Sequence, residues 1–260
     1  GYPARKAALK LLDAVLHRGE TLDVAAHGAL QGLRSGPDKA LARALAGEVL
    51  RWLTDLDRLI DSATRQILPP DAKARSVLRL MLAGWRRLDT PPHAVIATGL
   101  PLLSGGPRRL AHGVFSALVR QDVKLPAAPS LPPAVAQRWG ARADAIAAGL
   151  AVPPPLDLTL RDPSTTDEWA ERLGGASLAP GHVRLARGTA VENLAGFESG
   201  AWWVQDLAAS LPARLLGAGG GRRVLDLCAA PGGKTLQLAA AGWQVTAVEL
   251  SAKRAKRIEE

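Results

Sequence analysis

The chain has 260 residues, of which 47% are hydrophobic and 22% charged, and it carries a formal net charge of +9. This length and apolar fraction predict a globular protein of two ordinary domains and exclude a disordered or fibrous chain. A single cysteine excludes an internal disulfide and a multi-cysteine zinc site, and five histidines without ligand-like spacing give no reason to expect a metal. No apolar run of about eighteen residues and no N-terminal secretion signal are present, so we expect a cytoplasmic protein without a membrane segment.

The first half of the chain has the apolar periodicity of amphipathic helices and no strand-like alternation. Thr21 is a suitable N-cap for the second helix. We therefore predict an all-α bundle of six or seven helices. The predicted helices cover residues 4–17, 22–33, about 37–60, 71–85, 92–103 and 107–120.

The positive charge is concentrated in the same half. Residues 1–124 carry 19 basic and 11 acidic side chains, whereas residues 125–260 carry 14 and 13. A basic domain beside a cofactor-binding segment suggests a polyanionic substrate such as nucleic acid, although an arginine-rich solvated surface has the same composition. The candidates for phosphate contacts stand near the starts of helices: Arg5, Lys6, Lys10, Arg108 and Arg109.

A Pro-rich stretch follows the helical half. Residues 125–133 contain four prolines, which predicts a stiff, extended linker. Residues 134–202 are expected to form a small α+β segment, with a helix over 134–150, a strand over 156–161, a helix over 166–173 and a strand over 183–185. Trp202 and Trp203 are expected to open a helix, where packing is favoured over stacking on bases.

A strand, a small-residue turn and a helix are predicted over residues 223–240, and a second strand over residues 244–249 ends at Glu249. Gly232 and Gly233 permit a sharp turn, and the helix that follows directs its first N–H groups at a ligand. A phosphate-binding loop would need glycine at Cys228, and the dinucleotide pattern G-x-G-x-x-G is also missing. An adenosine-type cofactor without phosphates, S-adenosylmethionine, fits this turn best.

The run DLCAAPGGKT at residues 226–235 resembles the first cofactor motif of the RNA (cytosine-5) methyltransferases of the Nol1/Nop2/Sun family. The runs LAGFESG at 194–200 and WVQDLAAS at 203–210 are similar to the segment that precedes this motif in the bacterial Sun/Fmu-type enzymes. In the first half, VLRLMLAGW at 77–85, PHAVIA at 92–97 and AHGVFSALV at 111–119 are similar to the NusB-type RNA-binding domain.

The resemblance implies a multi-domain chain. Its parts would be a NusB-like all-helical RNA-binding domain at 1–124, the linker at 125–133, the small α+β segment at 134–202, and at 203–260 the start of a Rossmann-like methyltransferase domain. It also implies S-adenosylmethionine as cofactor and ribosomal RNA as partner, and we expect a monomer. The implied cofactor-binding residues are Cys228, Ala229, Ala230, Pro231, Gly232, Gly233 and Lys234, with Glu249 as the acidic ribose ligand.

The chemistry of the family needs a cysteine thiolate that adds to carbon 6 of cytosine and so activates carbon 5. Cys228 is the only cysteine, and in the family its position in the cofactor loop is not the nucleophile. We therefore expect the chain to end within the methyltransferase domain, with the nucleophile beyond Glu260 and the 260-residue fragment inactive. The alternatives are a non-catalytic RNA-binding or assembly module with a relic cofactor loop and, more remotely, a P-loop nucleotidase.

Overall fold

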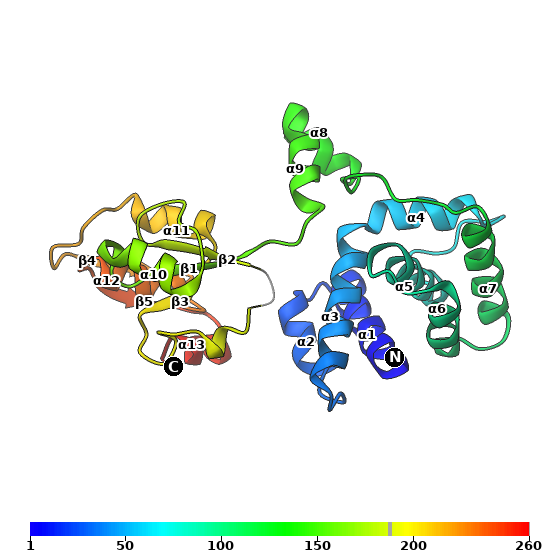
Figure 1. Ribbon diagram of the computed structural model, residues 1–260, viewed down its shortest axis with the longest axis horizontal. Coiled ribbons are helices and arrows are strands. Elements are labelled where there is room, and N and C mark those ends of the chain that lie inside the picture. The colour runs from blue at the N-terminus through cyan, green and yellow to red at the C-terminus, as the bar shows by residue number, and fades with distance from the viewer. Residues whose placement is uncertain (187–188, 260) are drawn as a thin grey trace. The chain divides into compact units, whose positions relative to one another are not determined.

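The computed structural model describes residues 1–186 and 189–259, and the chain divides into two compact units, Gly1–Val152 and Pro153–Glu260. The described part of the first unit is helical, and the strands lie in the second (Figure 1). The expected order of a helical bundle followed by α and β elements is thus confirmed.

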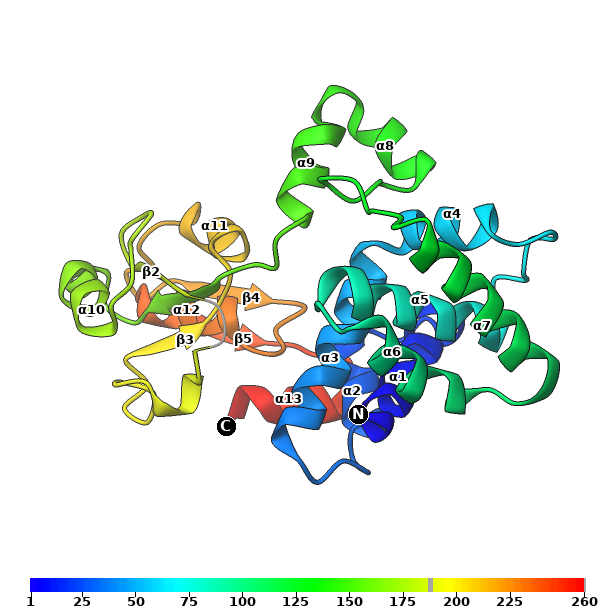
Figure 2. The ribbon, with the colours of Figure 1, turned by 45° about the vertical axis from the view of Figure 1, so that its right-hand side comes forward.

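The first unit is built around one buried helix. Its helices are α1 (Tyr2–Arg18), α2 (Leu22–Ala29), α3 (Gly36–Arg51), α4 (Leu53–Ser62), α5 (Lys73–Arg87), α6 (Pro92–Gly99), η1 (Leu100–Leu102), α7 (Gly105–Arg120), α8 (Pro133–Trp139), η2 (Gly140–Arg142) and α9 (Ala143–Leu150). Helix α5 packs against α1, α3, α4, α6 and α7 and lies among them in Figure 2. Because it is surrounded, even polar side chains of α5 are buried.

Local sequence explains where several helices begin and end. The hydroxyl of Thr21 accepts a hydrogen bond from the N–H of Val24, so the predicted N-cap of α2 is confirmed. The single helix predicted over about 37–60 is interrupted at Trp52, which has φ −105° and ψ 18° and separates α3 from α4. The Trp52 side chain is buried in the core, so packing of this ring accompanies the change of helix direction.

Two buried arginines join α5 to α4. The Nε and Nη2 atoms of Arg79 donate to the two carboxylate oxygens of Asp57 at 2.7 and 2.8 Å. Arg75 lies 3.1 Å from the same carboxylate and also contacts Asp61. Both arginine side chains are only 4% exposed, so part of the positive charge of this half is inside the fold.

The Pro-rich stretch is attached to the helical unit. The backbone N–H of Ser130 donates to Oδ2 of Asp55 at 2.7 Å, and Arg58 on the same helix, α4, donates to the Ser130 hydroxyl at 2.9 Å. Pro129 is buried beside this contact. The predicted extended stretch therefore runs along α4 before α8 begins.

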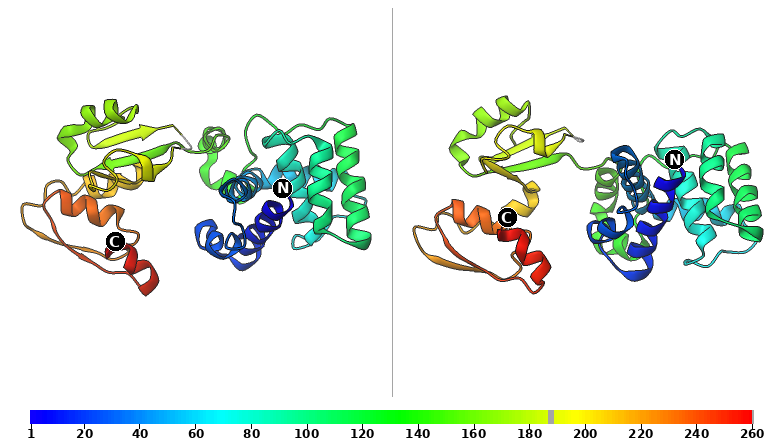
Figure 3. Two further views of the ribbon diagram at one scale, coloured as in Figure 1. Left: turned by 60° about the horizontal axis from the view of Figure 1, so that its bottom comes forward. Right: turned by 90° about the horizontal axis from the view of Figure 1, so that it is seen from below.

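The second unit contains two small sheets. Its elements are β1 (Leu156–Leu160), η3 (Pro163–Thr165), α10 (Thr166–Leu173), β2 (His182–Leu185), η4 (Val191–Asn193), β3 (Trp202–Val204), α11 (Leu207–Arg214), β4 (Arg223–Asp226), α12 (Gly233–Ala240), β5 (Gln244–Ala247) and α13 (Ala252–Glu259). Strands β2, β1 and β3 form an antiparallel sheet in this order, and β4 pairs with β5 in parallel. In Figure 3 the gold helix α11 lies between the two sheets, in agreement with its packing against β1 and α12.

The prediction that Trp202 and Trp203 open a helix is wrong. They form strand β3, in which Trp203 pairs with Thr159 and Trp202 with Leu160 of β1. Trp202 is buried in the core of the sheet and its indole N–H donates to the carbonyl of Ala195 at 2.9 Å. Pairing with a strand more than forty residues earlier decides this conformation, and local sequence carries no signal of it.

The predicted domain limits remain predictions, because the two compact units are a coarser division of the chain. Helices α8 and α9 are grouped with the first unit, and β3 crosses the predicted limit between residues 202 and 203. The second of these differences follows from the pairing of β3 with β1.

Candidate cofactor site

The parallel pair β4 and β5 forms the base of the candidate site. The strands are paired from Arg223 with Gln244 to Asp226 with Ala247, so their carboxyl ends lie at the same edge. The ladder is prolonged there, because the N–H of Val248 donates to the carbonyl of Asp226 at 2.8 Å. The turn between β4 and α12 starts at this edge, which is where ligands of parallel α/β sheets are generally bound.

The turn itself requires glycine. Gly232 is the N-cap of α12 and has φ +110°, a value that L side chains rarely adopt. Its N–H donates to the carbonyl of Ala229 at 2.8 Å, which closes the turn, and α12 begins at the next residue, Gly233. The first N–H groups of α12 therefore begin at the carboxyl edge of the two strands.

The carboxylate of Glu249 lies against this turn. One of its oxygens accepts a hydrogen bond from the N–H of Ala230 at 3.4 Å, and the other accepts from the N–H of Ser251 at 3.0 Å. Arg254 donates to the carbonyl of Ala230 at 2.8 Å and lies 3.5 Å from Glu249. The pKa of Glu249 lies below its ordinary value, mainly because its carboxylate accepts the hydrogen bond from the Ser251 N–H. The carboxylate is therefore charged at neutral pH.

The other side chains of the turn have distinct roles. Asp226 accepts a hydrogen bond from the Thr235 hydroxyl at 2.8 Å, which links the end of β4 to the first turn of α12. Ala229 and Ala230 are buried beneath the turn, whereas Cys228 is a free, exposed thiol and Lys234 is exposed. The Asp226 carboxylate thus stabilises the turn.

Sequence reasoning missed the contribution of Ser251 and Arg254. Both belong to the segment that follows Glu249, and they hold its carboxylate and the turn together. A serine two residues after an acidic residue is a weak signal in a sequence. The contact becomes visible only when the two strands are paired.

The five candidate phosphate contacts do not form one cluster. Lys6 and Lys10 are exposed on α1, and Arg108 and Arg109 are exposed on α7. Helix α1 packs against α2, α3, α5 and α6, whereas α7 packs against α5 and η1. The two pairs therefore lie on different helices that are separated by the core of the bundle.

Arg5 is not available as a surface cation. Its side chain is buried, at 6% exposure, and its guanidinium donates to the carbonyl of Gly1 at 3.2 Å. Burial lowers the pKa of Arg5 from its ordinary value. The structure therefore speaks against Arg5 as a phosphate contact, because α1 turns this position toward its neighbours and away from solvent.

The described residues contain neither a metal-binding cluster nor a helix that could cross a membrane. Within residues 1–186 and 189–259, no group of three or more His, Cys, Asp or Glu side chains is arranged to hold a metal ion. In the same part of the chain, every helix is too short or too polar to cross a membrane.

Comparison with known proteins finds a matching family for the first part of the chain and another for the last part. Residues 2–102 match the NusB family, and residues 213–260 match the family described as 16S rRNA methyltransferase RsmB/F. The chain is 32% identical to Ribosomal RNA small subunit methyltransferase B of Klebsiella pneumoniae, over 98% of the chain and 65% of the relative. It is 30% identical to the protein of the same name in Xanthomonas campestris, over 100% of the chain and 64% of the relative.

The chain thus spans about 65% of the length of these curated relatives. Among solved structures, the crystal structure of PH0851 is similar over 100% of the chain and 66% of its own length, with a TM-score of 0.65 and 17% identity. At this identity the likeness shows the fold alone. Residues 2–102 therefore form a NusB-family domain, and residues 213–260 belong to the RsmB/F methyltransferase family.

Proposed function

We propose that this chain carries the RNA-binding part and half of the cofactor site of an enzyme that methylates carbon 5 of a cytosine in ribosomal RNA. The observation that carries the proposal is the charged carboxylate of Glu249 against the glycine turn of two parallel strands. The names of the relatives support ribosomal RNA as the substrate.

S-adenosylmethionine fits the groups of the candidate site. The carboxylate of Glu249 would accept hydrogen bonds from the ribose hydroxyls, and the first N–H groups of α12 would donate to the methionine carboxylate. The remaining residues of the turn, from Cys228 to Lys234, would surround the methionine and adenosine portions. When bound, this cofactor supplies an electrophilic methyl group. The site has no full phosphate cradle, and S-adenosylmethionine needs none.

The helical unit is proposed to hold the RNA. Lys6, Lys10, Arg108 and Arg109 are exposed and would contact phosphates, which position a nucleic acid without reading its sequence. Cys228 would not be the catalytic nucleophile, because it is part of the cofactor turn. The thiolate that adds to carbon 6 of cytosine would come from a later part of the parent protein.

Isothermal titration calorimetry of the 260-residue chain with S-adenosylmethionine and with ATP tests the cofactor. We expect heat of binding with S-adenosylmethionine and none with ATP. Binding of ATP alone would contradict the proposal and favour a nucleotidase. If neither ligand binds, while the chain retains ribosomal RNA, the alternative of an RNA-binding module with a relic cofactor loop is favoured.

Replacing Gly232 by valine is expected to abolish binding of S-adenosylmethionine. A β-branched residue cannot take φ +110° without strain, so the turn would move and the start of α12 would no longer face the ligand. The matched control is Gly220→Val, because Gly220 also has positive φ, +58°, but precedes β4. Equal loss of binding in both variants would assign the effect to general strain.

Replacing Glu249 by alanine is expected to weaken S-adenosylmethionine binding about tenfold or more, since hydrogen bonds to a charged acceptor are lost. The Glu249→Gln variant retains one acceptor oxygen and should show a smaller loss. Calorimetry at pH 7 measures both affinities. Unchanged affinity in the alanine variant would show that the carboxylate only supports the turn through Ala230 and Ser251.

A further inference from the structure

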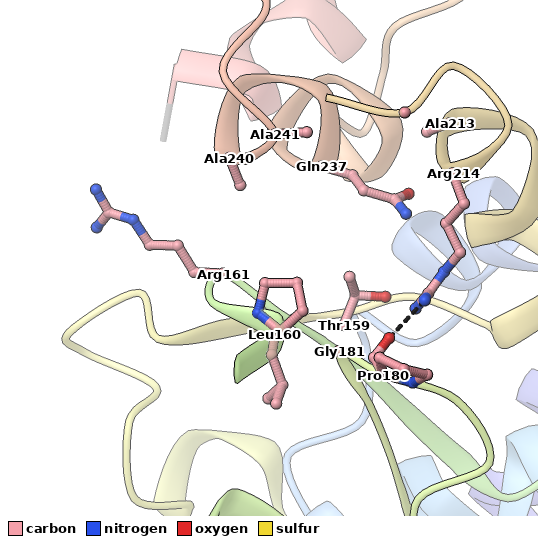
Figure 4. Close-up of a pocket in the computed structure, with 12 residues that line it drawn as sticks. Thr159, Leu160, Arg161, Pro180, Gly181, Ala213, Arg214, Gln237, Ala240 and Ala241 are labelled. Atoms are coloured by element: carbon pink, nitrogen blue, oxygen red, sulfur yellow. Dashed lines mark hydrogen bonds between the residues drawn. The ribbon is translucent and has the colours of Figure 1, made fainter. Parts of the chain in front are cut away.

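A cavity of about 220 Å³ lies within the second unit, between the end of β1 and the helices α11 and α12 (Figure 4). It is separate from the cofactor turn, because its described lining includes Gln237 and Ala240 in the second half of α12 and no residue of the turn at 228–234. Pockets for drug-sized ligands typically measure about 300 to 1,000 Å³. This cavity therefore has the size for a ligand much smaller than a whole cofactor.

The wall of this cavity is mainly apolar and carries positive charge. Its two charged side chains are Arg161 and Arg214, and none of its described lining residues is acidic. A wall of this kind favours a ligand that has an apolar body and a negative charge. The apolar part of the wall is formed by Leu160, Pro163, Ala213, Ala240 and Ala241, among others.

Arg214 is fixed at one end of the cavity by neutral partners. Its Nε donates to the Ser210 hydroxyl at 3.0 Å, and its Nη1 donates to the carbonyl of Pro180. The salt bridges among the described residues of the second unit join other side chains. The fold thus sets the position of this guanidinium and leaves its charge available to an anion.

Thr159 supplies a hydroxyl without a partner at the same end of the cavity. It is 3% exposed, and its Oγ1 makes no hydrogen bond within the described residues. In Figure 4 this hydroxyl points toward the guanidinium of Arg214, whereas Arg161 extends to the opposite end. A buried hydroxyl without a partner costs free energy, so its position indicates a ligand that completes the hydrogen bond.

The uncharged amide in the wall already has its partners. Gln237 donates from Nε2 to the carbonyl of Ser210 at 3.1 Å, and its Oε1 accepts from Nε2 of Gln205 at 3.3 Å. The groups left for a ligand at this end are the hydroxyl of Thr159 and the guanidinium of Arg214, and both can donate. Two donors that face the same space suit the two oxygens of a carboxylate, which also carries the complementary charge.

We propose that this cavity binds a small organic acid, with its carboxylate between Thr159 and Arg214 and its apolar body against the wall that includes Ala240. A bare inorganic anion suits the cavity less well, because apolar walls remove its hydration without compensation. A neutral molecule would leave the charge of Arg214 without a counterion. The site goes beyond the proposed function, since it requires neither methyl transfer nor RNA.

Titration of the ¹⁵N-labelled chain with benzoate tests this site through the amide signals of Thr159, Gly181 and Gly217. We expect these signals to shift at millimolar benzoate, the range for a ligand of about nine non-hydrogen atoms. Benzamide has the same shape without the charge and should bind about tenfold more weakly. Acetate has the charge without the ring and should leave the signals unchanged at the same concentration. No shift with benzoate, or equal shifts with benzoate and acetate, would overturn the proposal.

Replacing Thr159 by valine separates a ligand-binding hydroxyl from a structural one. Valine has nearly the same shape, and the hydroxyl it removes has no partner in the described part of the fold. We therefore expect the melting temperature of the ligand-free chain to stay the same or to rise. Benzoate should bind about fivefold more weakly, as expected for the loss of one hydrogen bond. Unchanged affinity for benzoate would contradict the assignment, whatever the melting temperature.

The two arginines of the wall provide a matched pair of variants. Arg214→Gln removes the charge beside Thr159 and keeps an amide that can donate to the carbonyl of Pro180, and it should weaken benzoate binding about tenfold. Arg161→Gln removes an equal charge at the opposite end and should leave the affinity within about twofold of wild type. Equal losses in the two variants would show attraction to net charge alone and would overturn the placement of the carboxylate.

Discussion

Replacing Asp157 by asparagine is expected to lower the free energy of unfolding of the second unit by about 2 kcal/mol at pH 7. The carboxylate of Asp157 is buried and accepts hydrogen bonds from the Nε and Nη2 atoms of Arg184 at 2.7 and 2.8 Å. It also accepts from the N–H of Leu207, the first residue of α11, at 3.1 Å. Asparagine loses the charge that this network requires.

The loss should depend on pH in a defined direction. The pKa of Asp157 is lowered from an ordinary value of 3.8 to about 2, mainly by the hydrogen bonds that the Arg184 guanidinium donates to this carboxylate. Because the folded-state pKa is depressed, the carboxylate stabilises the fold fully above its ordinary pKa, and this contribution is lost as the pH falls through about 2. The stability difference between wild type and variant should therefore close between about pH 4 and pH 2.

Urea unfolding followed by circular dichroism, repeated across this pH range, measures the difference. Asp162→Asn is the matched control, because Asp162 is exposed and asparagine can still accept from Ser164. Its unfolding free energy should change by no more than about 0.5 kcal/mol. A difference for Asp157→Asn that stays constant down to pH 2 would refute the assigned role of the carboxylate.

The variant Asp57→Ala is expected to destabilise the helical unit by about 3 to 5 kcal/mol. Asp57 is the carboxylate that Arg79 binds with two hydrogen bonds and that Arg75 also approaches. Both arginines are nearly buried, so alanine would leave their charges without this partner inside the fold. A loss of this size is a large share of the stability of a typical domain.

The helical signal of circular dichroism during urea unfolding reports this effect. The control is Asp13→Ala, since Asp13 is exposed on helix α1 and its pair with Arg18 lies at the surface. Surface ion pairs contribute about 0 to 1 kcal/mol, so the control should remain close to wild type. If the two variants lose similar stability, the pairing of Asp57 with Arg75 and Arg79 stabilises the fold no more than a surface ion pair does.

Local patterns were sufficient to predict most elements of the chain. The apolar stripe of residues 4–17 appears as α1, and the helix predicted over 166–173 is α10 with the same limits. The strands predicted around the glycine turn are β4 and β5, which end at Asp226 and Ala247, slightly earlier than expected. Periodicity and capping depend on near neighbours, which explains why they could be predicted.

Features that depend on distant partners were missed or misjudged. Trp202 and Trp203 form a strand because β1 is there to pair with them. Arg5, Arg75 and Arg79 look like surface charges in a sequence, yet they are buried by helices far away along the chain. The cavity between Thr159 and α12 joins residues about eighty positions apart, and only folding brings them together.

By itself, the sequence determined the helical first half, the glycine turn between two strand-forming runs and the presence of an acidic residue after the second run. Tertiary structure decided which charges remain exposed, that the carboxylate of Glu249 meets the N–H of Ala230, and that a cavity opens between β1 and α12. The physical reason is the range of the interactions. Backbone propensity and amphipathic spacing act over a few residues, whereas burial and side-chain pairing depend on segments that become neighbours only in the fold.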